Sequence, residues 1–187
     1  MIKNVHFNVD IYTCVVFTFG IYDNNKSEIL CQGLQGYNEG SSRKGVFDMA
    51  AIIVYFSRKD ENYVSGTIKK LAIGNTEIAA NILQKLTEAE TFKMQPVQEY
   101  SKDYNECIAQ AQADQRRGAR PELKAYPKSL DAYDTIYLGY PNYWGTMPMA
   151  VFTFLEHFDF TGKAIFPFCT HEGSGMANSE ADIKFFL

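Results

Sequence analysis

The sequence lacks the patterns that mark metal sites, disulfide scaffolds and nucleic-acid binders. Its 4 cysteines are scattered, with no Cys-x-x-Cys pair and no histidine at zinc-finger spacing. This disfavours structural zinc and a disulfide framework, and it favours reduced thiols in a cytoplasmic protein. The formal net charge of -4 argues against a nucleic-acid partner, since such proteins carry a basic surplus. We therefore expect no metal and no nucleic acid.

Long hydrophobic runs are also missing. The longest, Thr13 to Tyr22, is about half of what a bilayer-spanning helix needs. It follows Asp10 rather than a basic run, and no small-residue cleavage site comes after it, so the pattern of a signal peptide is weak. We expect no membrane partner.

Several catalytic motifs are absent as well. The sequence has no Walker loop, no Gly-x-Gly-x-x-Gly pattern, no serine-hydrolase elbow and no paired catalytic carboxylates. The absence of the two nucleotide-binding motifs disfavours nucleoside triphosphates and dinucleotides as ligands. An organic cofactor that carries its own chemistry would fill a site of this kind.

The chain divides into two unequal parts, residues 1–48 and 49–187. The first part has strand propensity over Ile11 to Phe19 and then a stretch rich in glycine and serine at 32–45, which is typical of a flexible linker. A second interpretation is that residues 1–48 are not native. Met49 opens the compact pattern, and Arg43-Lys44-Gly45 can be encoded by a purine-rich stretch that resembles a ribosome-binding site.

The second part alternates strand and helix signals. Short apolar runs predict strands buried on both faces of a parallel sheet, and apolar residues at helical spacing predict the segments between them. The expected strands are 51–56, 92–97, 135–140 and 163–169, and the expected helices are 75–86, 104–117, 149–158 and 179–187. This order predicts an α/β fold with a doubly wound parallel sheet.

Ligands of such sheets bind beyond the carboxyl ends of the strands, so the loops after three of the strands are the candidate ligand-binding segments. The first loop, 57–76, opens with Ser57 and Arg58 and closes with Gly74, Asn75 and Thr76 at the start of a helix. Hydroxyl groups and a glycine at a helix N-terminus predict an anion site. The alternative is that Asn75 or Thr76 only caps the helix.

The second loop places two adjacent aromatic residues between prolines. A stiff loop with a flat apolar face can stack on a planar ring, and the alternative is ordinary packing over the rim of the sheet. Its candidate residues are Pro141, Asn142, Tyr143, Trp144 and Gly145.

The third loop combines glycines with hydroxyl groups, which lets the backbone approach a ligand closely. His171 beside Glu172 is compatible with acid–base work, although a lone histidine in a loop is more often solvated. The candidate residues here are Thr170, His171, Glu172, Gly173 and Ser174.

Together these loops resemble the flavodoxin family, specifically its short bacterial members. The motifs are IVYFSRKDENY at 53–63, GNTEIAANI at 74–82, GYPNYWGTMPMAVFTFLE at 139–156 and FPFCTHEGSG at 166–175. The resemblance implies a five-stranded parallel sheet of order 2-1-3-4-5 and non-covalent FMN. It also implies that the first loop, with Ser57, Arg58, Gly74, Asn75 and Thr76, surrounds the phosphate, and that the second and third loops line the two edges of the flavin ring.

The chain departs from the family pattern in two places. Residues 58–73 lengthen the phosphate loop, where Tyr63 would close over the flavin. The chain also ends at Lys184 to Leu187, within the fourth helix, so the fifth strand and last helix are expected to be missing. That would leave strand 163–169 as an open edge able to drive self-association, unless the run Ile11 to Phe19 covers it.

Three functions follow from the resemblance. The first is an FMN-dependent electron carrier that docks on redox partner proteins. The second is a reductase that uses NAD(P)H and bound FMN to reduce quinones or other small-molecule electron acceptors. The third is a truncated, non-functional remnant. The sequence favours flavin-dependent electron transfer and does not separate carrier from reductase.

Overall fold

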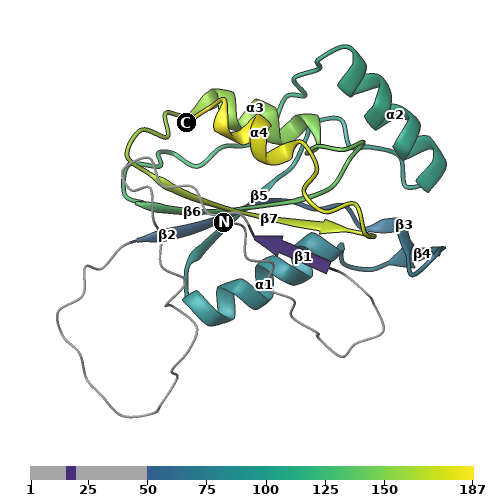
Figure 1. Ribbon diagram of the computed structural model, residues 1–187, viewed down its shortest axis with the longest axis horizontal. Coiled ribbons are helices and arrows are strands. Elements are labelled where there is room, and N and C mark those ends of the chain that lie inside the picture. The colour runs from purple at the N-terminus through teal and green to yellow at the C-terminus, as the bar shows by residue number, and fades with distance from the viewer. Residues whose placement is uncertain (1–15, 20–49) are drawn as a thin grey trace, which may run out of the picture.

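The protein is described by a computed structural model, whose described residues are 16–19 and 50–187 (Figure 1). The strands are β1 Val16–Phe19, β2 Ala51–Phe56, β3 Asp60–Val64, β4 Thr67–Leu71, β5 Glu90–Met94, β6 Thr135–Pro141 and β7 Ala164–His171. The helices are α1 Asn75–Thr87, α2 Tyr104–Arg116, α3 Met149–His157 and α4 Ser179–Lys184. Within these residues no helix is long and apolar enough to cross a membrane.

The main sheet confirms the predicted doubly wound arrangement. Its order is β1-β7-β6-β2-β5, and β5, β2, β6 and β7 run parallel to one another. In chain order these four strands give the expected sequence 2-1-3-4. Their carboxyl ends therefore meet at one edge of the sheet, where the fold predicts a ligand site.

The edge beside β7 differs from the main expectation, because β1 pairs with it in antiparallel orientation. The register places Val16 opposite His171 and Phe19 opposite Phe168. The expectation of an unpaired edge is therefore wrong for this half of β7, and residues 16–19 of the run Ile11 to Phe19 cover it. Residues 11–15, like the rest of the N-terminal extension, lie outside the described residues. Self-association stays a prediction.

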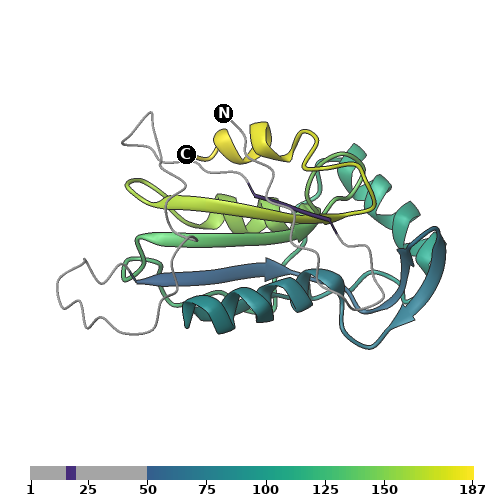
Figure 2. The same cartoon turned by 60° about the horizontal axis from the view of Figure 1, so that its bottom comes forward.

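Helices cover both faces of the sheet, with α1 on one side and α3 and α4 on the other (Figures 1 and 2). Side chains of β2 alternate between the two. Ile52 and Val54 join the larger core with α3 and α4, whereas Ile53 packs with the alanines of α1. Phe154 of α3 is completely buried in the larger core. Truncation of such a side chain to alanine typically costs about 3–5 kcal/mol, so this face supplies much of the stability.

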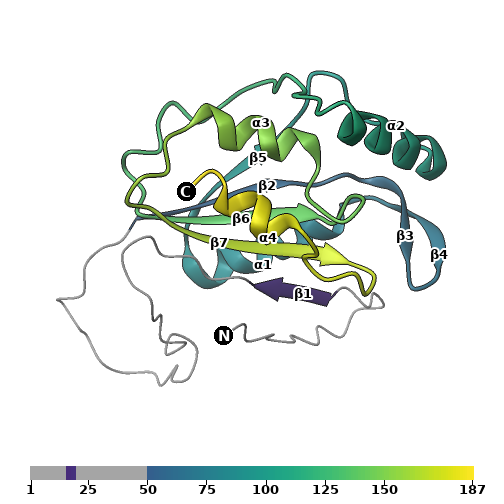
Figure 3. The same ribbon diagram turned by 45° about the horizontal axis from the view of Figure 1, so that its top comes forward.

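The long loop after β2 contains a β-hairpin, which the sequence analysis did not predict. Strands β3 and β4 pair with Tyr63 opposite Ile68 and are joined by Ser65 and Gly66, whose φ angles are 52° and 79°. Positive φ at both turn residues is typical of the two-residue turns that match strand twist. The hairpin lies beyond the end of the sheet, next to α2 (Figure 3).

Candidate functional site

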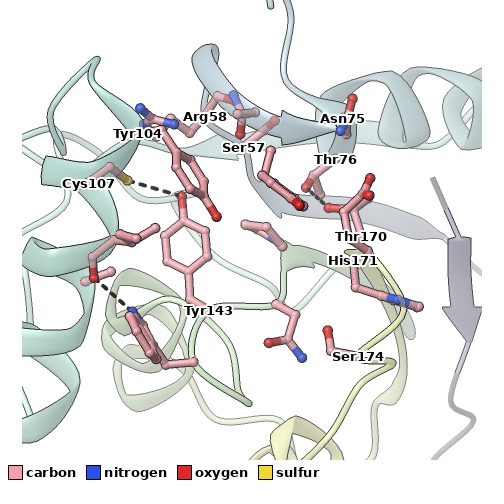
Figure 4. A pocket seen from close by; sticks show the side chains of 18 residues that line it. Ser57, Arg58, Asn75, Thr76, Tyr104, Cys107, Tyr143, Thr170, His171 and Ser174 are labelled. Atoms are coloured by element: carbon pink, nitrogen blue, oxygen red, sulfur yellow. Dashed lines mark hydrogen bonds between the residues drawn. The ribbon is translucent and has the colours of Figure 1, made fainter. Parts of the chain in front are cut away.

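A cavity of about 340 Å³ lies beyond the carboxyl ends of β2, β6 and β7 (Figure 4). All three predicted loops contribute to its wall, which confirms that they come together, although the role of each residue stays a prediction. Of the predicted residues, those lining it are Ser57, Arg58, Asn75, Thr76, Pro141, Asn142, Tyr143, Trp144, Thr170, His171, Glu172 and Ser174. Gly74, Gly145 and Gly173 do not line the cavity.

One end of the cavity is formed by the N-terminus of α1. The first amides of a helix have no acceptor inside it and carry partial positive charge. The amide of Glu77 donates to Ser57 Oγ at 3.1 Å, which leaves the hydroxyl proton free to be donated to an anion. Gly74 is the N-cap and has no side chain to cap the helix, so the first-turn amide of Glu77 is capped from outside the helix by Ser57. The alternative that Asn75 or Thr76 only caps α1 is therefore wrong.

Gly74 is required here by close packing rather than by its backbone angles. A Cβ at this position would lie 2.3 Å from the Arg58 carbonyl oxygen and 2.4 Å from Ser57 Oγ. Only a glycine lets the strand end and the helix start approach so closely. The close approach holds Ser57 against the first turn of α1.

A buried hydrogen bond links the first loop to the third. The hydroxyls of Thr76 and Thr170 are 2.8 Å apart, and their residues are 2% and 6% exposed. The two residues lie 94 positions apart in the sequence. The bond therefore fixes the distance between the end of β7 and the first turn of α1.

Asn142 holds the second loop in place. Its amide nitrogen Nδ2 donates to the Gly175 carbonyl at 2.9 Å, and its Oδ1 accepts from the Gly145 amide at 3.0 Å. Its backbone amide donates to the Thr170 carbonyl at 2.9 Å. Trp144 and Gly145 follow with φ angles of 52° and 82°. The second and third loops thus form one bonded unit.

The two adjacent aromatic residues of the second loop take different places. Tyr143 packs against Phe56 and Tyr100, each with ring centroids 6.1 Å apart, and its hydroxyl lies 3.9 Å from Cys107 Sγ. Burial raises the pKa of Tyr143 well above its usual value, so the hydroxyl stays protonated. Trp144 lies at the rim, 47% exposed, and its indole nitrogen donates to the backbone carbonyl of Ile108 at 2.9 Å.

The third loop presents a histidine that is neutral near pH 7. His171 Nδ1 accepts a hydrogen bond from the Gly173 amide at 3.0 Å, which requires an unprotonated nitrogen. Burial lowers the pKa of His171, while the nearby Glu172 carboxylate acts in the opposite direction. The Glu172 Oε2 accepts from the Ser65 amide at the hairpin tip, at 3.1 Å.

Arg58 lines the cavity but directs its guanidinium to backbone carbonyls. Its Nη2 donates to Ser101 at 2.8 Å and to Lys102 at 2.9 Å, its Nε donates to Ser101 at 3.0 Å, and its Nη1 donates to Glu61. Contact with a phosphate stays a prediction for this residue. Through these bonds Arg58 joins β3 to the segment that precedes α2.

Sequence reasoning missed one wall of the cavity. Helix α2 contributes Tyr104, Cys107, Ile108 and Ala111, and β3 adds Asn62 beside the anticipated Tyr63. The four α2 positions have the spacing of a single helix face, which is a readable signal. That face gives no hint from sequence alone of whether it covers a core or a ligand.

The flavodoxin family model matches residues 68–186. A protein assigned to the flavoproteins from Bacteroides uniformis ATCC 8492 is 27% identical, with a TM-score of 0.59 over 73% of this chain and 81% of that one. Another, from Bacteroides eggerthii DSM 20697, is 26% identical, with a TM-score of 0.58 over 73% and 79%.

A weaker match is a flavoprotein in complex with FMN from Lactobacillus acidophilus NCFM. It is 19% identical, with a TM-score of 0.45 over 58% of this chain and 66% of that one. None of the curated proteins gives a significant match. The family model, which covers well over half of the sequence, and the parallel sheet with its cavity beyond β2, β6 and β7 agree: the chain belongs to the flavodoxin family.

Proposed function

We propose that this flavodoxin binds FMN without a covalent bond and uses it to pass electrons between redox partners. The observation that carries the proposal is that one cavity joins the N-terminal end of α1 to a group of aromatic rings. FMN has the matching chemistry, with a phosphate at one end and a planar ring at the other. Partners are redox proteins or small-molecule electron acceptors that reach the ring at the rim.

The anion end suits a phosphate in detail. The first turn of α1 offers backbone amides, and Ser57 and Thr76 place hydroxyls beside it. The Glu77 carboxylate in the same turn is neutralised by Lys93, whose Nζ lies 2.6 Å from it. An anion bound here therefore meets donors and partial positive charge rather than an unpaired carboxylate.

The other end suits a planar ring. Tyr143 forms part of the wall, Trp144 stands at the rim, and Tyr63 stacks on Tyr104 with centroids 6.0 Å apart. Aromatic walls contribute apolar contact area and a flat stacking geometry. FMN, when bound, supplies the ability to take up and release electrons. The chain's own residues bind it, orient it and exclude water from the ring.

The test is retention of FMN by the purified protein. After incubation with excess FMN and desalting, we expect the two flavin absorption bands to remain with the protein and the flavin fluorescence to be quenched by stacking. Riboflavin, which has the same ring without the phosphate, is the control. It should bind about tenfold or more weakly if the α1 end holds the phosphate.

Electron transfer is then tested on the loaded protein. Bound FMN is reduced with dithionite, and its reoxidation by a quinone is followed by absorbance. A protein that retains no FMN would overturn the proposal, and equal affinity for FMN and riboflavin would overturn the assignment of the anion end.

A further inference from the structure

The β3–β4 hairpin forms a wall of the cavity that is attached at both ends. Its strand β3 contributes Asn62 and Tyr63 to the cavity lining. The half of the hairpin near Asp60 and Glu61 is its base, and the turn at Ser65 and Gly66 is its tip. The two ends are held by different contacts and with different strength.

The base is held by a dense set of bonds to the segment that precedes α2. Arg58 bonds the carbonyls of Ser101 and Lys102 on one side and that of Glu61 on the other. The Glu61 amide donates to the Lys102 carbonyl at 3.2 Å, and the Glu61 carboxylate accepts from the Tyr104 amide at 3.1 Å. The planar guanidinium, with several donors in a fixed arrangement, is suited to joining carbonyls from two segments.

The tip is joined to the third loop through the Glu172 carboxylate, which accepts from the Ser65 amide at 3.1 Å. Glu172 also lines the cavity, and this bond spans 107 positions in the sequence. A single bond at an exposed position breaks more readily than the set at the base. The tip is therefore the end at which the wall can open.

We propose that Arg58 and Glu172 are positioning residues that fasten the β3–β4 hairpin over the cavity, so that the bound cofactor leaves when the hairpin opens, most readily at the tip contact with Glu172. The part of this proposal that concerns cofactor release rests on the proposed function. The attachment of the hairpin by Arg58 and Glu172 does not depend on it. It predicts that Arg58 acts through the geometry of its bonds to carbonyls and not through its charge.

The first test is Arg58→Lys, which keeps the charge and removes the planar set of donors. We expect FMN release to become about tenfold faster, as measured by the recovery of flavin fluorescence. Hydrogen exchange of the Glu61 and Tyr104 amides in the ligand-free protein should also become faster, while the amides of β6 keep their rates. Arg120→Lys is the matched control, because Arg120 is exposed and pairs with Glu156 outside this cavity.

The second test separates the tip from the base. Glu172→Ala removes the acceptor and should speed FMN release about three- to tenfold. Glu172→Gln keeps an acceptor oxygen and should restore most of the slow release. Glu122→Ala is the control, since Glu122 is exposed and does not line the cavity.

The outcomes separate this proposal from the proposed function. A wild-type protein that retains no FMN refutes FMN binding, and amide exchange then still decides whether Arg58 and Glu172 fasten the hairpin. If wild type binds FMN and Arg58→Lys leaves both release and amide exchange unchanged, the fastening is refuted. Faster amide exchange with unchanged FMN release refutes the control of cofactor exit.

Discussion

The two ends of the cavity are built in different ways. The anion end consists of backbone amides of α1 and two buried hydroxyls, and its residues Thr76 and Thr170 are 2% and 6% exposed. The ring end consists of side chains from the hairpin, α2 and the second loop, with Trp144 at 47% exposure. The anion end depends on a close approach of backbone segments, whereas the ring end depends on contacts between distant segments. Substitutions at the anion end should therefore lower FMN affinity and stability more than substitutions at the ring end.

The largest effect should come from Gly74→Ala. The added methyl would lie 2.3 Å from the Arg58 carbonyl oxygen, so the strand end and the first turn of α1 must move apart. We expect FMN affinity to fall about 100-fold and the free energy of unfolding to fall by about 2–3 kcal/mol. Isothermal titration and urea denaturation measure the two quantities.

Gly118→Ala is the matched control for this substitution. Gly118 has a φ of 59°, but a Cβ there meets nothing within 4 Å. Alanine should cost about 1 kcal/mol of stability through its backbone angle alone and leave FMN affinity unchanged. Equal losses of FMN affinity in both variants would show that Gly74 matters only for general stability.

The next effect concerns the bond that joins the anion end to the third loop. Thr76→Val keeps the shape of the side chain but leaves the Thr170 hydroxyl buried without its 2.8 Å partner. We expect a loss of about 1–2 kcal/mol in the free energy of unfolding. Thr91→Val, at an exposed position of β5, should change stability by less than about 0.5 kcal/mol.

A double-mutant cycle sharpens this prediction. Thr76→Val with Thr170→Val removes both hydroxyls, so no buried donor is left without an acceptor. Urea denaturation of the double variant should show a smaller loss than the sum of the two single variants, with a coupling of about 1 kcal/mol. Strict additivity would mean that the two hydroxyls do not stabilise each other.

The same contrast explains how much could be predicted from the sequence. Apolar runs such as Ala51–Phe56 predict buried parallel strands, and Gly74-Asn75-Thr76 predicts a helix N-terminus at an anion site, because both signals are local. The three loops were predicted to meet because parallel strands end at one edge of the sheet. The strands, the helix start and the meeting of the three loops are present in the structure, and anion binding at the helix start stays a prediction.

Features without an apolar pattern in a single stretch of sequence were missed. The strands Asp60–Val64 and Thr67–Leu71 carry few buried side chains, so the hairpin shows no apolar alternation, although Ser65-Gly66 is a turn signal. The task of Arg58 depends on carbonyls at 101–103, more than forty positions away. No sequence window contains both partners of such a contact.

The edge of the sheet teaches the same point from the opposite direction. The apolar run that includes Val16–Phe19 had clear strand propensity, but its pairing with the edge strand 163–169 was predicted only as an alternative to an open edge. Its pairing with Phe168–His171 depends on main-chain hydrogen bonding, which is nearly independent of side-chain identity. Strand propensity was therefore readable, whereas the partner of the strand was an open alternative.

The smallest effect should be a pH dependence that originates in the third loop, from His171. Its pKa is lowered by burial, and its Nδ1 already accepts the Gly173 amide, so the folded protein holds this proton less tightly than the unfolded chain. Stability should therefore fall as the pH is lowered from about 7 to about 5.5, through the ordinary range of histidine titration.

His171→Asn keeps an acceptor and does not titrate, so urea midpoints of the variant should fall less over this range. Because the Glu172 carboxylate acts against the shift, the difference should be modest, and Glu172→Gln should enlarge it. Parallel pH profiles for wild type and His171→Asn would show that protonation of His171 does not destabilise the folded protein.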